Sequence, residues 1–168
     1  MALILDTTAA GASSNAYCTL AEAEIYMEAR LHKANWTAAT DADKNAAIAW
    51  ATRILDEELD WDGSVYTSTQ ALRWPRIGVY TRDNYAISDS TIPQFLKNAT
   101  AEFAFKLIEE DRTTDYSMAG LKKIVIEGAV QLTADKSIQK PSIPNSVYNM
   151  VSFCAIRSSK RARFLTRV

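Results

Sequence analysis

The sequence has little of the side-chain chemistry on which enzymes depend. It has one histidine, His32, two cysteines, Cys18 and Cys154, and five scattered glycines among 168 residues. A catalytic relay of the Ser-His-Asp or Cys-His type has only His32 to use, and these three residues have no recognised zinc-ligand spacing. The glycines form no phosphate-binding loop. We therefore expect no catalytic residue, no metal site and no cofactor, and a protein that is not an enzyme.

Long hydrophobic runs are also absent. No stretch approaches the roughly 18 apolar residues of a transmembrane helix, and the N-terminus has only a four-residue apolar run without preceding positive charge. We expect no signal peptide and no membrane partner. The two cysteines are far apart, which favours buried free thiols in a reducing compartment over a disulfide. With 168 residues, 48% hydrophobic and 23% charged, the chain has the composition of one globular domain.

The net charge of −1 hides an uneven distribution. The last twelve residues, RSSKRARFLTRV, hold five of the 19 basic residues and no acidic one, so residues 1–156 keep 14 basic against 20 acidic residues, a net charge of −6. A basic tail favours an acidic partner surface, whether phosphate or carboxylate, and the alternative is a frayed, solubilising terminus. The candidate contact residues of this tail are Arg157, Lys160, Arg161, Arg163, Phe164 and Arg167.

Apolar periodicity predicts a mainly α fold, a small helical bundle within residues 1–156, preceded by an extended N-terminal arm over 1–16 and followed by the basic tail over 157–168. Capping signals place helix starts at Thr19 with Glu22, at Thr40, at Pro93 and at Asn145. The helices are expected to end near residues 31, 59, 111 and 156, with a polar turn over 32–40. Alternating residues over 121–133 predict a β-hairpin or short strands.

Some thirty residues without a regular period separate the second predicted helix from the third. They include QALRWPRIGVYTRDNYAI at 70–87, which is far too apolar to be disordered and is therefore an ordered loop. Aromatic residues and arginine are enriched at protein interfaces, and a proline fixes the backbone around it. The candidate contact residues of the loop are Gln70, Arg73, Trp74, Pro75, Arg76, Tyr80, Arg82, Asp83 and Tyr85.

Two acidic clusters, within 56–62 and 109–111, fall at predicted helix C-termini. Negative charge there costs about 0.3–1 kcal/mol unless a cation compensates. We expect these carboxylates to pair with Arg73, Arg76 and Arg82, in the same chain or a neighbouring one. Solvated faces are the alternative, and acid–base catalysis is a remote one.

Four segments carry a family resemblance: NAYCTLAEAEIYMEARL, TAATDADKNAAIAWATRILD, QALRWPRIGVYTRDNYAI and IPQFLKNATAEFAFKLI. The chain resembles the head–tail connector, or adaptor, proteins of tailed phages, some of which are catalogued as DnaT-like single-stranded DNA-binding proteins. The resemblance covers roughly residues 15–110, and its most specific element is QALRWPR followed by an aromatic residue and RD. The tail is longer and more basic than the family pattern.

The resemblance implies a structural virion protein of the neck, present in the host cytoplasm during assembly. Copies of the chain would form a ring, often twelve-fold, that docks onto the portal protein and carries a stopper or tail-terminator protein. Genomic DNA would pass through the lumen without sequence readout.

The alternative is a single-stranded DNA-binding protein of phage replication. Trp74, Tyr80 and Tyr85 would stack bases at roughly 1–3 kcal/mol each, with the loop arginines on phosphates. The acidic body opposes this alternative, because phosphate binding needs positive charge. Trp74 between Leu72 and Pro75 is equally consistent with a plug over the helices. A self-contained chaperone-like helical domain is a third possibility, with nothing in the sequence in its favour.

Overall fold

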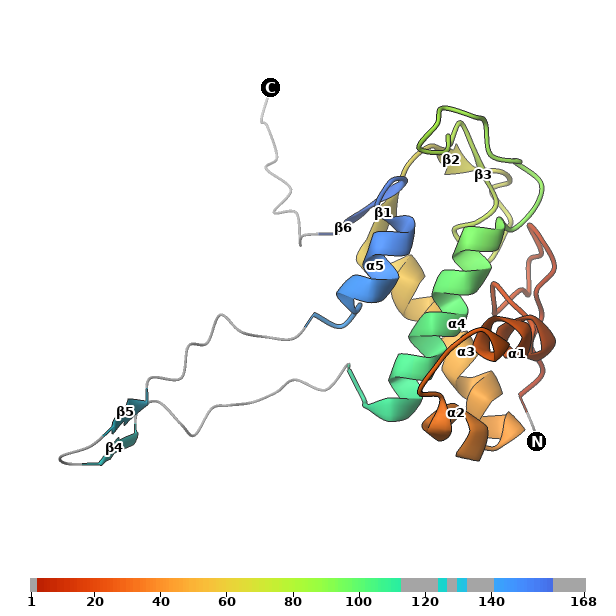
Figure 1. Ribbon diagram of the computed structural model, residues 1–168. Coiled ribbons are helices and arrows are strands. Elements are labelled where there is room, and N and C mark those ends of the chain that lie inside the picture. The colour runs from red at the N-terminus through yellow and green to blue at the C-terminus, as the bar shows by residue number, and fades with distance from the viewer. Residues whose placement is uncertain (1–2, 113–123, 127–129, 133–140, 159–168) are drawn as a thin grey trace, which may run out of the picture.

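The computed structural model describes residues 3–112, 124–126, 130–132 and 141–158, and it confirms a mainly α fold (Figure 1). The helices of the described residues are α1 (Leu20–Glu28), α2 (Ala34–Ala38), α3 (Asp41–Glu58), α4 (Gln94–Glu109) and α5 (Asn145–Val151). The strands are β1 (Leu59–Trp61), β2 (Ser64–Val65), β3 (Arg76–Ile77), β4 (Ile124–Ile126), β5 (Val130–Leu132) and β6 (Ala155–Arg157).

Local capping explains where the first long helices begin. At α1 the Thr19 hydroxyl accepts the N–H of Glu22 at 3.2 Å, and the Glu22 carboxylate accepts the N–H of Thr19 at 2.8 Å, which completes the predicted capping box. At α3 the Thr40 hydroxyl accepts the N–H of Asp43 at 3.2 Å. Both predicted starts are confirmed. Asn145, predicted as a cap, is instead the first residue of α5.

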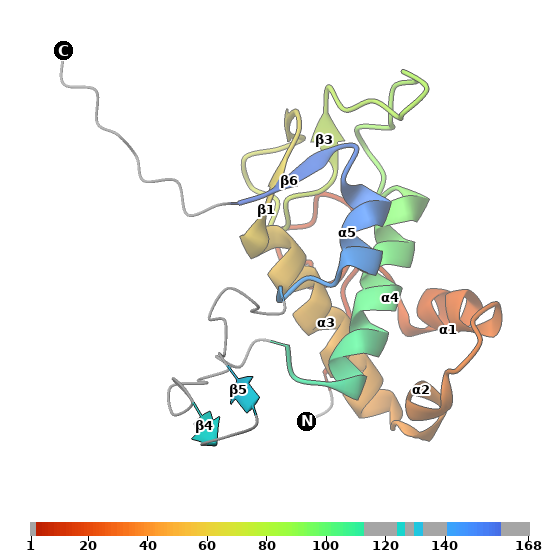
Figure 2. The same ribbon diagram turned by 60° about the vertical axis from the view of Figure 1, so that its left-hand side comes forward.

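α4 lies at the centre of the helical body, between α3, α5 and α1 (Figures 1 and 2). Leu96, Ala99, Phe103 and Leu107, which recur at helical spacing in the sequence, form one buried face, and Phe105 on a neighbouring face is buried as well. A helix that is apolar on several faces packs on several sides. Each large apolar side chain buried here contributes about 1.5–3 kcal/mol relative to an exposed one.

The segment predicted as a polar turn contains a helix, α2. Its Trp36 is 1% exposed, and the indole Nε1–H donates to the Glu24 carboxylate of α1 at 3.1 Å. The Lys44 ammonium of α3 lies 5.5 Å from the centre of the same indole ring. α2 is thus held by tertiary contacts, and its five residues lack the periodic run that predicts a helix from sequence.

The C-terminal helix ends earlier than predicted, because residues 155–157 form a strand. β6 pairs antiparallel with β1, with Leu59 opposite Arg157 and Trp61 opposite Ala155. Arg157 is therefore not part of a basic tail beyond the domain: its guanidinium donates to the Ile143 carbonyl at 3.1 Å and to Asn145 Oδ1 at 2.9 Å. The other predicted tail residues, Lys160, Arg161, Arg163, Phe164 and Arg167, lie outside the described residues.

β4 and β5 form an antiparallel pair with Ile124 opposite Leu132, as the alternation over 121–133 predicts, and the predicted turn between them lies outside the described residues. The N-terminal arm, predicted to be extended, folds back on itself over its described part. The Asp6 carbonyl accepts the N–H groups of Asn15 at 2.9 Å and Ala16 at 3.3 Å, and the Asn15 side-chain oxygen accepts the N–H of Asp6 at 2.9 Å.

Candidate interaction surface

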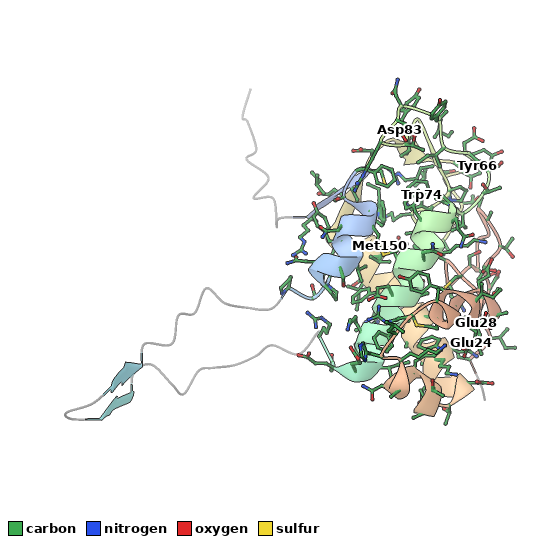
Figure 3. All side chains as sticks on the ribbon, in the orientation of Figure 1. Glu24, Glu28, Tyr66, Trp74, Asp83 and Met150 are labelled. Atoms are coloured by element: carbon green, nitrogen blue, oxygen red, sulfur yellow. The ribbon has the colours of Figure 1, made fainter. Side chains whose placement is uncertain are left out.

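The α3–α4 loop, residues 62–93, is anchored by a buried tryptophan. Trp74 is 1% exposed, and its ring packs edge-on against Trp61 at a centroid distance of 5.6 Å and against Phe95 at 5.7 Å (Figure 3). Phe95 continues this contact to Phe153 at 4.9 Å. Trp74 is thus a plug over the helices, and its ring has no exposed face on which a base could stack.

Gln70 and Pro75 also make contacts within the chain. The Gln70 side chain donates to the carbonyls of Leu72 at 2.7 Å and Pro75 at 3.1 Å, while its Oε1 accepts the N–H of Thr67 at 2.9 Å. Pro75 itself is buried after a cis peptide bond with Trp74. Gln70 and Pro75 therefore stabilise the conformation of the loop through contacts within it.

Arg76 binds backbone carbonyls at the base of the loop. Its guanidinium donates to Asp62 at 2.6 Å, Gly63 at 2.7 Å, Arg73 at 3.1 Å and Trp61 at 3.2 Å. Burial, followed by the neighbouring Arg73 charge, lowers the pKa of Arg76. Arg76 is 7% exposed, and four of its five N–H donors bind these carbonyls, so the expected ion pair with a carboxylate is not among the contacts of the described residues.

Asp56 connects the loop to α3 and to the N-terminal arm. Its carboxylate accepts the backbone N–H of Arg73 at 3.0 Å and the hydroxyl of Tyr17. Burial raises the pKa of Asp56 to about 6, against the opposing effect of these hydrogen bonds. The same burial, with the negative charge of Asp56, raises the pKa of Tyr17.

The predicted ion pairs between the acidic clusters and the loop arginines are not formed within the described part of the chain. Asp56 contacts the backbone of Arg73 rather than its guanidinium, and Glu57 pairs with Arg53 of its own helix at 3.8 Å. Glu58 accepts the hydroxyl of Ser142. Lys106 lies 2.7 Å from Glu109 at the end of α4.

The tip of the loop presents exposed aromatic side chains. Tyr80 bridges to Ala86, and the turn between them includes Asn84 at a positive φ of 62°. Tyr80 is 53% and Tyr85 73% exposed. Arg82 donates to the Asn149 carbonyl of α5 at 3.2 Å and lies 5.7 Å from the Phe153 ring centre, which ties the tip to the helical body.

The structure therefore divides the predicted contact residues into two groups. Gln70, Trp74, Pro75 and Arg76 act within the loop, whereas Arg73, Tyr80, Arg82, Asp83 and Tyr85 are exposed at the surface. Figure 3 labels one residue of each group, Trp74 and Asp83. The sequence did not indicate two further exposed residues of the loop, Tyr66 directly after β2 at 42% and Ile77 within β3 at 44% exposed. No period marks them in the sequence, because β2 and β3 are only two residues long.

Within the described ranges, no three His, Cys, Asp or Glu side chains are grouped so that they could hold a metal ion. None of the described helices is long and apolar enough to cross a membrane. Cys18 and Cys154 are buried free thiols, as predicted, and burial raises the pKa of each to about 12. Neither thiol is therefore a reactive thiolate at neutral pH.

Together these features define a small, mainly α-helical protein with an internally braced loop that exposes tyrosines at its tip. The family described as "Putative DnaT-like ssDNA binding protein" matches residues 1–165, and the chain belongs to this family. The comparison with curated proteins found no match. The comparison with solved structures found none either. The narrower resemblance to head–tail connectors gains no support from the family match.

Proposed function

We propose that the protein binds single-stranded DNA through the tip of the α3–α4 loop. The observation that carries this proposal is the exposure of two tyrosines, Tyr80 at 53% and Tyr85 at 73%, on a tip that Arg82 ties to α5. The description of the family to which the chain belongs supports the same function.

The tip suits sequence-independent binding of unpaired bases. An exposed aromatic ring stacks any base at roughly 1–3 kcal/mol, because every base presents a π face. Arg82 contributes one N–H group to Asn149, and its remaining donors are available to a phosphate. Arg73 adds a second exposed guanidinium to the loop.

The net charge of the chain determines how strongly it is expected to bind single-stranded DNA. Residues 1–156 carry a net charge of −6, so the loop and the basic residues after 156 must supply the attraction to phosphate. We therefore expect weak binding, with dissociation constants in the micromolar range, that weakens steeply as salt is added.

The test is fluorescence anisotropy of a labelled oligo-dT titrated with the full chain. Replacing Tyr80 and Tyr85 together by alanine removes two stacking rings and is expected to weaken binding at least about tenfold. Tyr66→Ala, an exposed tyrosine of the same loop outside the tip, is the matched control and is expected to bind like the wild type. Equal affinity of the double variant and the wild type would show that the tip does not stack bases.

A second function, an adaptor ring at the phage head–tail interface, is favoured by the β4–β5 pair. Within the described residues these strands pair with each other alone, in a two-stranded sheet. Such a hairpin is marginally stable in water and needs a further strand or subunit beside it. A ring of these subunits, docked on a portal protein and carrying a stopper or tail-terminator protein, would supply that neighbour while DNA passes through its lumen.

Quantitative mass spectrometry of purified phage particles tests the second function. About one copy of this chain per portal subunit is expected of a neck ring. Absence from particles, together with abundance in infected cells, would contradict the adaptor role and leave DNA binding as the function.

A further inference from the structure

The C-terminal part of the chain has no acidic residue. Residues 136–168 contain neither aspartate nor glutamate, whereas residues 1–156 together carry a net charge of −6. Within this stretch the structure describes residues 141–158, which include α5 and β6. A polyanion that approaches α5 or β6 therefore meets no carboxylate from these two elements themselves.

The tip of the α3–α4 loop is continuous with α5. Arg82 of the tip donates to the Asn149 carbonyl at 3.2 Å, and its guanidinium lies 5.7 Å from the centre of the Phe153 ring. In Figure 3, Asp83 marks the tip and Met150 marks α5. The exposed groups of the tip and of α5 thus belong to one surface, and a strand bound at the tip has α5 beside it.

α5 presents uncharged amide side chains to the solvent. Its buried residues are Val147 and Val151, whereas Asn145 and Asn149 are exposed. Asn145 and Asn149 are four residues apart, so they lie on the same side of the helix, about 6 Å apart along its axis. An amide group both donates and accepts hydrogen bonds, so it suits phosphate oxygens and base edges alike.

An arginine lies at each end of this amide pair. Arg82 binds Asn149, as described, and Arg157 donates from one terminal nitrogen to Asn145 Oδ1 at 2.9 Å and to the Ile143 carbonyl at 3.1 Å. The other terminal nitrogen of Arg157, Nη1, makes no hydrogen bond with a described residue and is not buried, so it is open to a ligand. We call these four residues, Arg82, Asn149, Asn145 and Arg157, the α5 track.

Carboxylates lie near both ends of the α5 track. Asp83 follows Arg82 in the tip and is exposed. At the other end, Glu57 and Glu58 line a hollow that Arg157 also lines. Among the ion pairs between described residues, however, none involves Arg82 or Arg157. The two guanidinium groups are thus available to phosphates, and the nearby carboxylates are consistent with the weak binding expected above.

We propose that single-stranded DNA bound at the tip continues along the α5 track. Arg82 and Arg157 bind phosphates, and the amides of Asn149 and Asn145 contact the nucleotides between them. The sequence adds four basic residues after Ser158, beyond the Arg157 end of the track. The proposal rests on the DNA-binding function proposed above. It adds the course of the strand, and it makes the ligand a strand of several nucleotides rather than one or two bases.

The test is fluorescence anisotropy of labelled oligo-dT in about 0.1 M salt, with one substitution at each end of the amide pair. Asn145→Asp keeps an oxygen that accepts Arg157 and adds a negative charge away from the tip, so it is expected to weaken binding at least about threefold. Asn149→Lys adds a cation at an exposed position and is expected to strengthen binding by about the same factor. Circular dichroism checks that both variants remain folded.

Asn35 supplies the matched control. It is exposed on α2, which lies at the end of α4 away from the tip (Figures 1 and 2). Asn35→Asp and Asn35→Lys change the net charge of the chain by the same amounts as the two track variants. They are expected to leave the affinity within about twofold, because the effect of a charge is screened over a Debye length of about 10 Å at this salt concentration. Equal effects at Asn35 and in the track would overturn the proposal.

Failure of the track is distinguishable from failure of DNA binding at the tip. If alanine at Tyr80 and Tyr85 weakens binding while Asn145→Asp and Asn149→Lys bind as the wild type does, the tip binds DNA but the strand does not follow α5. That result would overturn the track and keep the proposed function. A wild-type chain that does not bind oligo-dT would overturn both.

Discussion

Asp56 is the residue whose protonation is most directly coupled to the loop. It joins the arm, α3 and the loop through the Tyr17 hydroxyl and the Arg73 N–H, and burial holds its pKa at about 6. Between its ordinary pKa of 3.8 and about 6, the folded chain binds more protons than the unfolded chain. The contribution of Asp56 to the free energy of unfolding is therefore full below this window and falls as pH rises through it.

Asp56→Asn removes this titration while it keeps one acceptor oxygen. From about pH 4 to about pH 7, we expect the free energy of unfolding of the wild type to fall relative to that of the variant, by on the order of 3 kcal/mol. Urea unfolding of both chains across this range gives the difference, in which the other titrating groups cancel. Parallel stability curves would show that Asp56 keeps its ordinary pKa in the folded chain.

Arg76 shows that residue type and sequence neighbours alone do not predict whether an arginine side chain is buried or exposed. An arginine beside tryptophan and proline in an irregular stretch is typical of an interface, yet Arg76 is enclosed by four carbonyls of its own chain. Those carbonyls come from residues 61–63 and 73, and their convergence depends on the path of the whole loop. No pattern within 70–87 reports that path, so the sequence does not separate Arg76 from the exposed Arg73.

At the scale of elements, the aromatic contacts of Trp74 join the loop to α4. Trp74→Ala would leave a cavity between Trp61 and Phe95, and we expect it to lower the free energy of unfolding by about 3–5 kcal/mol. Tyr85→Ala, 73% exposed in the wild type, is the control and is expected to stay within about 0.5 kcal/mol. Urea denaturation followed by circular dichroism measures both. A wild-type midpoint for Trp74→Ala would mean that the plug does not stabilise the fold.

Elements defined by local signals could be predicted, and elements defined by distant partners could not. The starts of α1 and α3 follow from capping residues three positions apart, and the buried face of α4 follows from its apolar period. α2 depends on Trp36 meeting Glu24, and β6 depends on β1, which lies far from it in the sequence. In the same way, composition identifies the loop residues as candidate contact residues, but tertiary packing decides which of their aromatic rings are buried.

At the scale of the whole molecule, Arg157 belongs to β6, so the basic tail begins after this strand rather than at residue 157. A chain that ends after Ser158 keeps the β1–β6 pair but lacks Lys160, Arg161, Arg163 and Arg167. We expect its free energy of unfolding to match that of the full chain within about 0.5 kcal/mol. Its affinity for oligo-dT is expected to fall less steeply as salt is added. The slope of log affinity against log salt concentration becomes smaller in magnitude by about 0.7 for each phosphate that the shortened chain no longer binds.

Anisotropy titrations at several salt concentrations measure this slope. The chain with alanine at both Tyr80 and Tyr85 is the comparison, because removing the stacking rings lowers affinity without changing the number of phosphates bound. An unchanged slope after truncation would mean that the basic residues after 158 do not contact DNA.

The bracing of the α3–α4 loop has a consequence for calorimetry. Arg76, Gln70 and the Trp74 plug order the loop within the free chain, so a ligand at the tip does not have to fold it. Coupled folding adds buried area beyond the contact itself and makes the heat-capacity change of binding large and negative. Binding at this tip is therefore expected to give a small heat-capacity change, proportional to the area that the ligand covers.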